Sequence, residues 1–263
     1  IPEIADTIIE IDNSMKWGYN FEMGPFEAWD AYGVKEAVER IEKDGFTIPT
    51  NVKVMLASGN TCFYKLESGI KYYYDFASGS YKEVPVGKNM VSIAAAKGNN
   101  KTVMENASAS LVDIGDDVFC VEFHTKMNAI NAEIVDTIDE ALDYVDKNGA
   151  GLVIGNEAGG MPGAFSAGAD LGFVSKLCHD KKYTEIETFL KKAQDGIQRT
   201  KYSAFPVVAA PYGMVLGGGC ETCLGADRIV AHSELYMGLV EIGVGLLPAG
   251  GGTMNLWKKY INA

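Results

Sequence analysis

Two glutamates stand in apolar, glycine-rich surroundings in the last third of the sequence. Glu221 directly follows LGGGC, and Glu241 lies 20 residues later in YMGLVEIGVG. Carboxylates are costly to bury in such contexts unless they act on something. If both face one cavity, repulsion and desolvation raise the pKa of at least one, so that one is protonated and one ionised near neutral pH. The pattern predicts paired acid–base chemistry; the alternative is that each glutamate caps a helix or pairs with Arg228 or a lysine.

Glycine is concentrated around these acids. The chain has 30 glycines among its 263 residues, and they are concentrated at 155–168, 213–219 and 243–252. Such loops let a backbone approach a ligand closely and turn its N–H groups inward. A nucleotide-binding loop is poorly supported. The nearest match to G-x-x-x-x-G-K-[ST], at 245–253, has no Lys directly before Thr253, and no G-x-G-x-x-G follows a strand with an acid about 20 residues on. A serine hydrolase is also poorly supported, because Ser166 in GAFSAG has the wrong spacing for G-x-S-x-G.

The cysteines offer a weaker candidate. Cys220 and Cys223 form a lone CxxC, and His232 is the only nearby residue that could join them around zinc. Packing of two small residues on a helix is the favoured interpretation, and we predict no metal site. Five cysteines in a chain of this length do not make a disulfide framework, which favours reduced thiols and a cytoplasmic location.

The elements that must position the two glutamates follow an α/β pattern from Ala107 onward. Alternating residues at 110–113 and 118–123 predict paired strands. Apolar residues at helical spacing predict a helix over 131–146, with Asn131 as its N-cap. The short apolar runs GLVIGNE and PVVAA predict two further strands, and the second of these leads into GMVLGGGCE.

The first 106 residues differ in character. Apolar residues at helical spacing over 4–15 and 34–41 predict that residues 1–66 are all-α. The segment SGIKYYYDFASGSYKEVPV predicts a β-hairpin or short meander that turns around 77–80. We therefore divide the sequence into residues 1–66, a β-rich connector at 67–106, and an α/β part at 107–263.

The overall composition limits the partners. Hydrophobic residues make up 47% of the chain, enough for a core, and the formal net charge is −12. That charge argues against nucleic acid and anionic membrane surfaces as partners. The longest uncharged stretch, 205–220, is too short and too interrupted by proline and glycine to span a membrane, and the start of the chain has no secretory signal.

Three motifs in order carry a resemblance to a known family. FSAGADL at 165–171, PVVAAPYGMVLGGGCE at 206–221 and GLVEIGVGLLPAGGGT at 238–253 closely resemble the crotonase superfamily, and within it the enoyl-CoA hydratases. The resemblance covers about 107 to the end. It implies a crotonase-type ββα spiral, truncated at its C-terminal side, and an oxyanion hole formed by the backbone N–H groups of Ala169 and Gly218. It also implies that Glu221 is the base and Glu241 the proton donor.

The same resemblance implies an acyl-CoA thioester as substrate, no cofactor for the hydratase part, and a homo-oligomeric full-length protein. The residues expected to line the substrate or coenzyme A are Ala167, Gly168, Asp170, Leu171, Gly217 and Lys126. The presence of both acids favours hydration of trans-2-enoyl-CoA. The alternatives are a Δ3-Δ2-enoyl-CoA isomerase, in which Glu241 alone shuttles a proton, and a non-catalytic acyl-CoA-binding or assembly module.

A second resemblance covers the first segment. MGPFEAWDAYGV at 23–34 resembles a motif in the helical C-terminal domain of 3-hydroxyacyl-CoA dehydrogenases, and the sequence at 46–65 resembles the end of that domain. The order implies a bifunctional fatty-acid β-oxidation protein whose NAD-binding part would precede Ile1. We expect the 263 residues alone to be weakly active or inactive, because helices that close the acyl pocket would follow Ala263.

Overall fold

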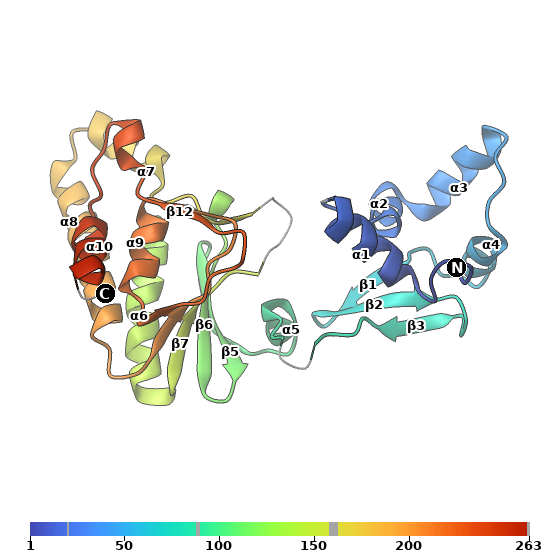
Figure 1. The fold of residues 1–263 in the computed structure, drawn as a ribbon, viewed down its shortest axis with the longest axis horizontal. Helices are drawn as coiled ribbons and strands as arrows, with labels where there is room; N and C mark the ends of the chain where they lie inside the picture. Colours follow the sequence, from blue (N-terminus) through green and yellow to red (C-terminus); the bar gives the residue numbers. More distant parts are fainter. Residues whose placement is uncertain (20, 88–89, 158–162, 262–263) are drawn as a thin grey trace. The chain divides into compact units, whose positions relative to one another are not determined.

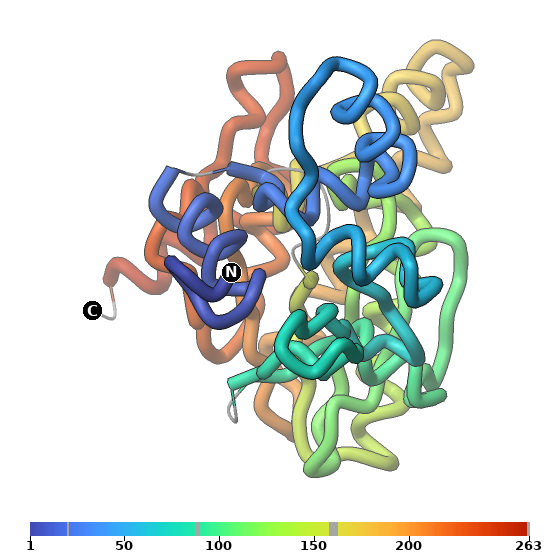
Figure 2. The backbone as a smooth tube through the Cα atoms, turned by 90° about the vertical axis from the view of Figure 1, so that its right-hand side faces the viewer, coloured from blue at the N-terminus to red at the C-terminus, as the bar shows by residue number. Residues whose placement is uncertain are grey.

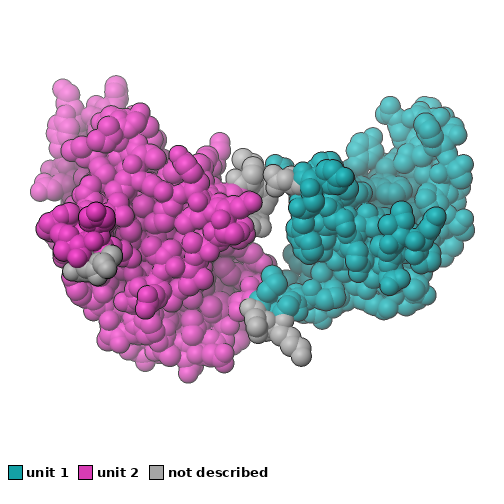
Figure 3. Space-filling view, viewed as in Figure 1, with its two compact units in different colours: residues 1–90 teal, residues 91–263 magenta. Residues whose placement is uncertain are grey.

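Buried hydrophobic side chains form separate clusters from residues before Met90 and from residues after it. The computed structural model accordingly divides into two compact units, residues 1–90 and 91–263 (Figure 3). The structure describes residues 1–19, 21–87, 90–157 and 163–261. The predicted connector at 67–106 does not form a unit of its own, because Tyr73 and Tyr74 pack into the same core as the helices of the first unit.

The described residues of the first unit form four helices and a three-stranded antiparallel sheet in the order β1-β2-β3 (Figure 1). Strand β1 already begins at Tyr64, so the end of the block predicted to be all-α is a strand. The predicted meander is confirmed, with its turn between β2 and β3. The elements are α1 (Ile8–Tyr19), α2 (Pro25–Tyr32), α3 (Val34–Lys43), α4 (Thr50–Ala57), β1 (Tyr64–Glu67), β2 (Ile70–Asp75) and β3 (Ser80–Glu83).

A buried aspartate joins two helices of this unit. Asp12 of α1 is 1% exposed, and its carboxylate accepts hydrogen bonds from the N–H groups of Phe26 at 2.8 Å and Glu27 at 3.3 Å. These are two of the N–H groups in the first turn of α2 that have no acceptor within the helix. Asp12 thus caps α2 from a neighbouring helix.

We expect Asp12→Ala to lower the free energy of unfolding of this unit by about 2 kcal/mol, because buried donors lose their acceptor. Denaturant unfolding followed by tryptophan fluorescence measures the change. Asp44→Ala is the matched control: Asp44 pairs with Arg40 at 3.6 Å on the surface, and such pairs contribute less than about 1 kcal/mol. Equal unfolding midpoints for the two variants would contradict the capping role.

The second unit is built on a six-stranded sheet in the order β11-β9-β7-β6-β5-β4. The strands β6, β7, β9 and β11 run parallel to one another. Strand β5 pairs antiparallel with both β6 and β4. A second, parallel sheet has the order β12-β10-β8. The strands are β4 (Thr102–Glu105), β5 (Ala109–Gly115), β6 (Val118–Phe123), β7 (Gly151–Ile154), β8 (Ala164–Ser166), β9 (Val207–Ala209), β10 (Met214–Leu216), β11 (Arg228–Ile229) and β12 (Tyr236–Gly238).

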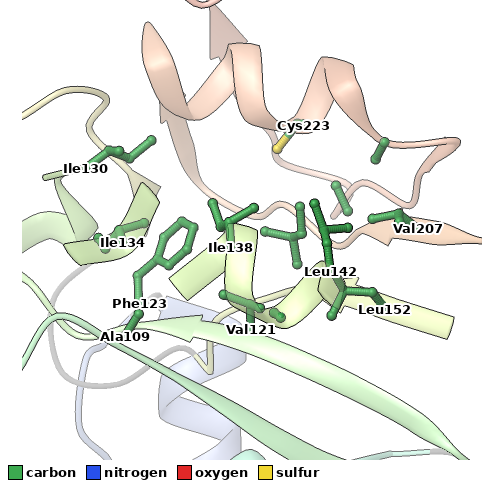
Figure 4. Close-up of a cluster of buried hydrophobic side chains, with 14 of the residues drawn as sticks. Ala109, Val121, Phe123, Ile130, Ile134, Ile138, Leu142, Leu152, Val207 and Cys223 are labelled. Carbon is green, nitrogen blue, oxygen red and sulfur yellow. The ribbon is translucent and has the colours of Figure 1, made fainter. Parts of the chain in front are cut away.

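Helices cover both faces of the six-stranded sheet. Val121 and Phe123 of β6 point into the main core, where Figure 4 shows side chains of α6 between those of the sheet and Cys223 of α9. Cys120 points to the opposite face and packs with Ile93 of α5. Figure 2 shows the path of the backbone, coloured by residue number. The helices of this unit are α5 (Ile93–Gly98), the short η1 (Lys126–Asn128), α6 (Ala132–Asn148), α7 (Leu171–His179), α8 (Tyr183–Lys201), α9 (Gly218–Gly225), η2 (Glu241–Val244) and α10 (Gly252–Ile261).

Several local predictions are confirmed in this unit. The fold class is α/β, strands β5 and β6 pair as expected, and the side chain of Asn131 accepts from Ile134 N at 3.0 Å as the N-cap of α6. None of the helices in the described residues is long and apolar enough to cross a membrane.

Candidate active site

The loop between β8 and α7 presents one backbone N–H group. Gly168 has φ +92°, a conformation that favours glycine. Its carbonyl accepts from Ile130 N at 2.7 Å, and Asp170 N donates to the Ile130 carbonyl at 2.8 Å. Because Ala169 lies between these two hydrogen bonds, its own N–H points away from Ile130.

The start of α9 presents a second N–H group beside the first. Gly217 is the N-cap of α9, with φ +49°, and Gly218 is the first helical residue. A Cβ added at Gly218 would lie 3.4 Å from Ala169 N, and one added at Gly168 would lie 3.2 Å from Gly218 N. In the part of the chain that the structure describes, neither Ala169 N–H nor Gly218 N–H has an acceptor. Both can therefore donate to one oxygen at the positive end of the α9 dipole.

Glu221 lies in the first turn of α9 and is held by a glycine loop. It is 4% exposed, and its carboxylate accepts from Gly250 N at 2.8 and 2.9 Å and from Gly252 N at 2.8 Å. Burial raises the pKa of Glu221 above its ordinary value, and the negative charge of Glu241 raises it further. The glycine N–H groups act in the opposite direction without reversing the shift.

Glu241 opens η2 and lies against the N-terminus of α9. Both of its carboxylate oxygens are buried and have no hydrogen-bond partner in the described residues. A Cβ added at Gly217 would lie 3.2 Å from Glu241 Oε1. A buried carboxylate in this state is suited to bind a water molecule or to exchange a proton with a substrate.

The structure therefore brings together the four residues predicted to carry the chemistry, namely Glu221, Glu241, Ala169 and Gly218. The other predicted residues have local structural contacts or exposed side chains. The Asp170 carboxylate caps α7, accepting from Gly172 N at 2.9 Å. Leu171 is the first residue of α7, and both its side chain and that of Lys126 in η1 are exposed. The N–H of Ala167 donates to Met127 O at 3.0 Å, and Gly217 contacts Glu241 as described.

The cysteines of the CxxC motif are placed in the core. Cys220 and Cys223 are buried in α9, and burial raises the pKa of Cys220 to about 11 and that of Cys223 to about 12. Both thiols are therefore protonated at neutral pH and are poor nucleophiles. Among the described residues, no group of three or more His, Cys, Asp or Glu is arranged to hold a metal ion.

Two functional residues were missed by the sequence reasoning. Gly250 and Gly252 supply the N–H groups that hold Glu221, across 29 and 31 residues of sequence. The sequence signal for them is the run GGG in PAGGGT, whose pattern does not indicate which side chain its N–H groups contact. Added Cβ atoms at Gly250 and Gly252 would lie 2.7 and 2.9 Å from atoms of the Glu221 side chain, which explains why glycine is needed there.

The pKa direction predicts how stability depends on pH. The folded-state pKa of Glu221 lies above its ordinary value, so the folded protein binds this proton more tightly than the unfolded chain does. Wild-type stability should fall, relative to Glu221→Gln, as the pH rises from the ordinary pKa of a glutamate through the folded-state pKa. We expect the Tm advantage of Glu221→Gln to be smallest in acid and largest at neutral pH. A difference in Tm that stays constant over this range, measured by thermal unfolding, would contradict the buried charge.

Comparison with known proteins adds to this geometry. A family model described as enoyl-CoA hydratase/isomerase matches residues 113–261, more than half of the chain. The chain belongs to the enoyl-CoA hydratase/isomerase family. A crystal structure of an enoyl-CoA hydratase from Bacillus anthracis, 22% identical, matches with a TM-score of 0.51 over 57% of each chain, which shows the crotonase fold shared by this family.

Two relatives of this enoyl-CoA hydratase/isomerase family member are longer proteins. A Bacillus subtilis protein named "Probable 3-hydroxyacyl-CoA dehydrogenase" is 46% identical over 98% of this chain and 32% of its own length. A fatty acid oxidation complex subunit alpha from Aliivibrio fischeri is 35% identical over 50% of this chain and 19% of its own length. The chain thus spans about a third of the first relative and about a fifth of the second.

Proposed function

We propose that this chain carries the hydratase site of a fatty-acid β-oxidation protein. The reaction is the reversible syn addition of water to trans-2-enoyl-CoA, giving 3-hydroxyacyl-CoA. The observation that carries the proposal is the placement of two buried carboxylates, Glu221 and Glu241, beside the paired N–H groups of Ala169 and Gly218.

Each group has a defined part in the proposed mechanism. The thioester oxygen accepts from Ala169 N–H and Gly218 N–H, which stabilise the negative charge that develops when the β-carbon is attacked. Glu221 removes a proton from a water molecule, and the oxygen of that water bonds to the β-carbon. Glu241 delivers a proton to the α-carbon, and transfer of the proton from Glu221 to Glu241 restores the starting state. The glycine N–H groups on Glu221 favour its ionised form and oppose, without reversing, the effects of burial and of Glu241, which raise its pKa.

One observation favours a second candidate within the same family. Glu221 is already engaged by Gly250 and Gly252, whereas the carboxylate oxygens of Glu241 have no partner among the described residues. A Δ3-Δ2-enoyl-CoA isomerase needs only one carboxylate to move a proton between two carbons of the substrate. Glu241 alone could serve that reaction, with the same two N–H donors.

The first unit fits the proposed setting. Its motif at 23–34 resembles the helical domain of 3-hydroxyacyl-CoA dehydrogenases, and the Bacillus subtilis relative with that name matches nearly the whole chain. We propose that this unit is the end of such a domain. NAD would then be bound by the dehydrogenase part of the complete protein, while the hydratase part uses no cofactor. Assembly into a homo-oligomer and a cytoplasmic location remain predictions.

The test is a crotonyl-CoA hydration assay on the complete protein, followed by the loss of absorbance of the conjugated thioester. Glu221→Gln is assayed in parallel, and a 3-enoyl-CoA substrate is offered to both proteins with product analysis. We expect hydration by the wild type and a large loss in the variant. Conversion of 3-enoyl-CoA without hydration would favour the isomerase, and acyl-CoA binding without either reaction would favour a non-catalytic module.

A further inference from the structure

Helix α8 presents three residues along one face. Gln194, Ile197 and Lys201 are spaced by three and four residues, so their side chains lie one above the other. None of the three touches Glu221 or Glu241 through a hydrogen bond or ion pair in the described residues. All three contact the segment that holds Glu221.

The two polar side chains bind this segment at its two ends. Gln194 Nε2 donates to the carbonyl of Ala249 at 2.7 Å, directly before Gly250. Lys201 Nζ donates to Asn255 Oδ1 at 2.5 Å, three residues after Gly252. The two glycines that donate to Glu221 lie between these two attachments.

The interior of the segment is held as well. Asn255 is completely buried, and its N–H donates to Gly251 O at 3.0 Å in the first turn of α10. Ile197 Cδ1 lies 3.0 Å from the position that a Cβ at Gly250 would occupy, so this side chain closes the space behind the loop. Three consecutive glycines have the largest conformational freedom of any such run, and they hold one conformation only if neighbouring groups fix them.

We infer that Gln194 and Lys201 are positioning residues for the acid–base pair: by fixing residues 249–255 from helix α8, they keep the N–H groups of Gly250 and Gly252 on the carboxylate of Glu221. This inference rests on the proposed function, since it assigns the residues that support Glu221 in that reaction.

The test uses near-isosteric changes in the complete protein. Gln194→Glu replaces the donor facing Ala249 O by an acceptor, and because Gln194 is exposed the fold should be retained. Lys201→Met keeps the aliphatic stem and removes the donor to Asn255. We expect each variant to lower kcat for crotonyl-CoA hydration about tenfold with KM unchanged, because Glu221 is less well placed. Gln194→Arg and Lys201→Arg, which keep donors, should restore most of the rate.

The pH profile separates positioning from a general structural effect. Weaker N–H contacts leave the pKa of Glu221 higher, so the acid limb of the kcat profile should move to higher pH in both variants. Neither variant changes Glu241, the charged group that acts on Glu221, but Gln194→Glu adds a negative charge and Lys201→Met removes a positive one. Gln194→Met removes the donor without changing the charge, so it should show the same movement of the acid limb if positioning is the cause. Lys191→Ala, on an exposed position of the same helix, should leave kcat and the profile as in wild type.

Thermal unfolding tests the positioning role without any catalytic turnover, so its result does not depend on the proposed function. The pH at which the Tm advantage of Glu221→Gln levels off, and the size of that advantage above this pH, should both rise when Gln194→Glu is the parent protein, because only the folded-state pKa of Glu221 is changed. If the wild type fails to hydrate but this shift occurs, the proposed reaction is wrong and the positioning role stands. If the wild type hydrates, and Gln194→Glu and Lys201→Met leave kcat, the acid limb and the Tm shift unchanged, the positioning role is wrong.

Discussion

Replacing Glu241 by glutamine is expected to lower kcat for enoyl-CoA hydration by about 10²–10⁴-fold. Glutamine keeps the shape of the side chain but cannot deliver a proton to the α-carbon. No structural hydrogen bond from the described residues is lost, because neither oxygen of Glu241 accepts one there. The loss should therefore fall on kcat, with little change in KM and none in the fold, as measured by initial rates and circular dichroism.

The second glutamate provides a cross-check on this result. Glu221→Gln should cause a loss of the same order. The double variant should lose about as much as the more impaired single variant, because the proposed addition of water needs both groups, and groups that act as a unit are strongly non-additive. Glu234→Gln is the matched control, since Glu234 is exposed in the connection between β11 and β12. Its rate should equal that of the wild type.

The outcomes distinguish the two candidate reactions. If Glu221→Gln keeps full turnover of 3-enoyl-CoA while Glu241→Gln abolishes it, the isomerase is supported. Full hydration by the Glu241→Gln protein would show that this residue is not the proton donor. Additive losses in the double variant would indicate that the two carboxylates act independently rather than together in one addition of water.

Local patterns allowed the framework of the site to be predicted from the sequence. The N-cap at Asn131 and the pairing of β5 with β6 depend on residues close together in the chain, and both are confirmed. The short strands β8, β10 and β12 were not predicted as a sheet, because three-residue strands among glycines are too short to show a period of two. Their pairing is fixed by tertiary packing.

The features that the sequence did not predict depend on contacts between segments far apart in the chain. That Glu221 is held by Gly250 and Gly252 follows from the approach of α9 to the start of α10, which no local pattern encodes. The packing of strand β2 on the helices of the first unit is a contact of the same kind. Alternation in the tyrosine run predicts strands, but it does not say that Tyr73 and Tyr74 pack on the preceding helices.

Gly168→Ala tests the proposed oxyanion hole, which would consist of backbone N–H groups and so cannot be removed by deleting a side chain. Gly168 has φ +92°, and a Cβ there would lie 2.7 Å from Leu216 O and 3.2 Å from Gly218 N. Both neighbours are backbone atoms, so the β8–α7 loop must move away from the start of α9. The N–H groups of Ala169 and Gly218 then no longer converge on one oxygen, and we expect kcat to fall by about 10²–10³-fold.

A glycine in a helix interior gives the matched control. Gly196 lies within α8, and an added Cβ there meets no atom within 4 Å. Gly196→Ala should keep the wild-type kcat and raise the free energy of unfolding by about 0.5–1 kcal/mol, because alanine favours the helix. Comparable losses of activity in the two variants would attribute the effect of Gly168→Ala to the added methyl group in general rather than to the loop.

Binding measurements decide whether the loss arises from the two donors. An acyl-CoA analogue with an enolate-like negative oxygen should lose more affinity in Gly168→Ala than a saturated acyl-CoA does, because only the developing charge depends strongly on both N–H groups. The carboxylates of Glu221 and Glu241 are left in place by this substitution, so slow residual hydration should keep the wild-type pH profile. A folded Gly168→Ala protein that binds the enolate-like analogue as tightly as wild type would exclude the N–H groups of Ala169 and Gly218 as the oxyanion hole.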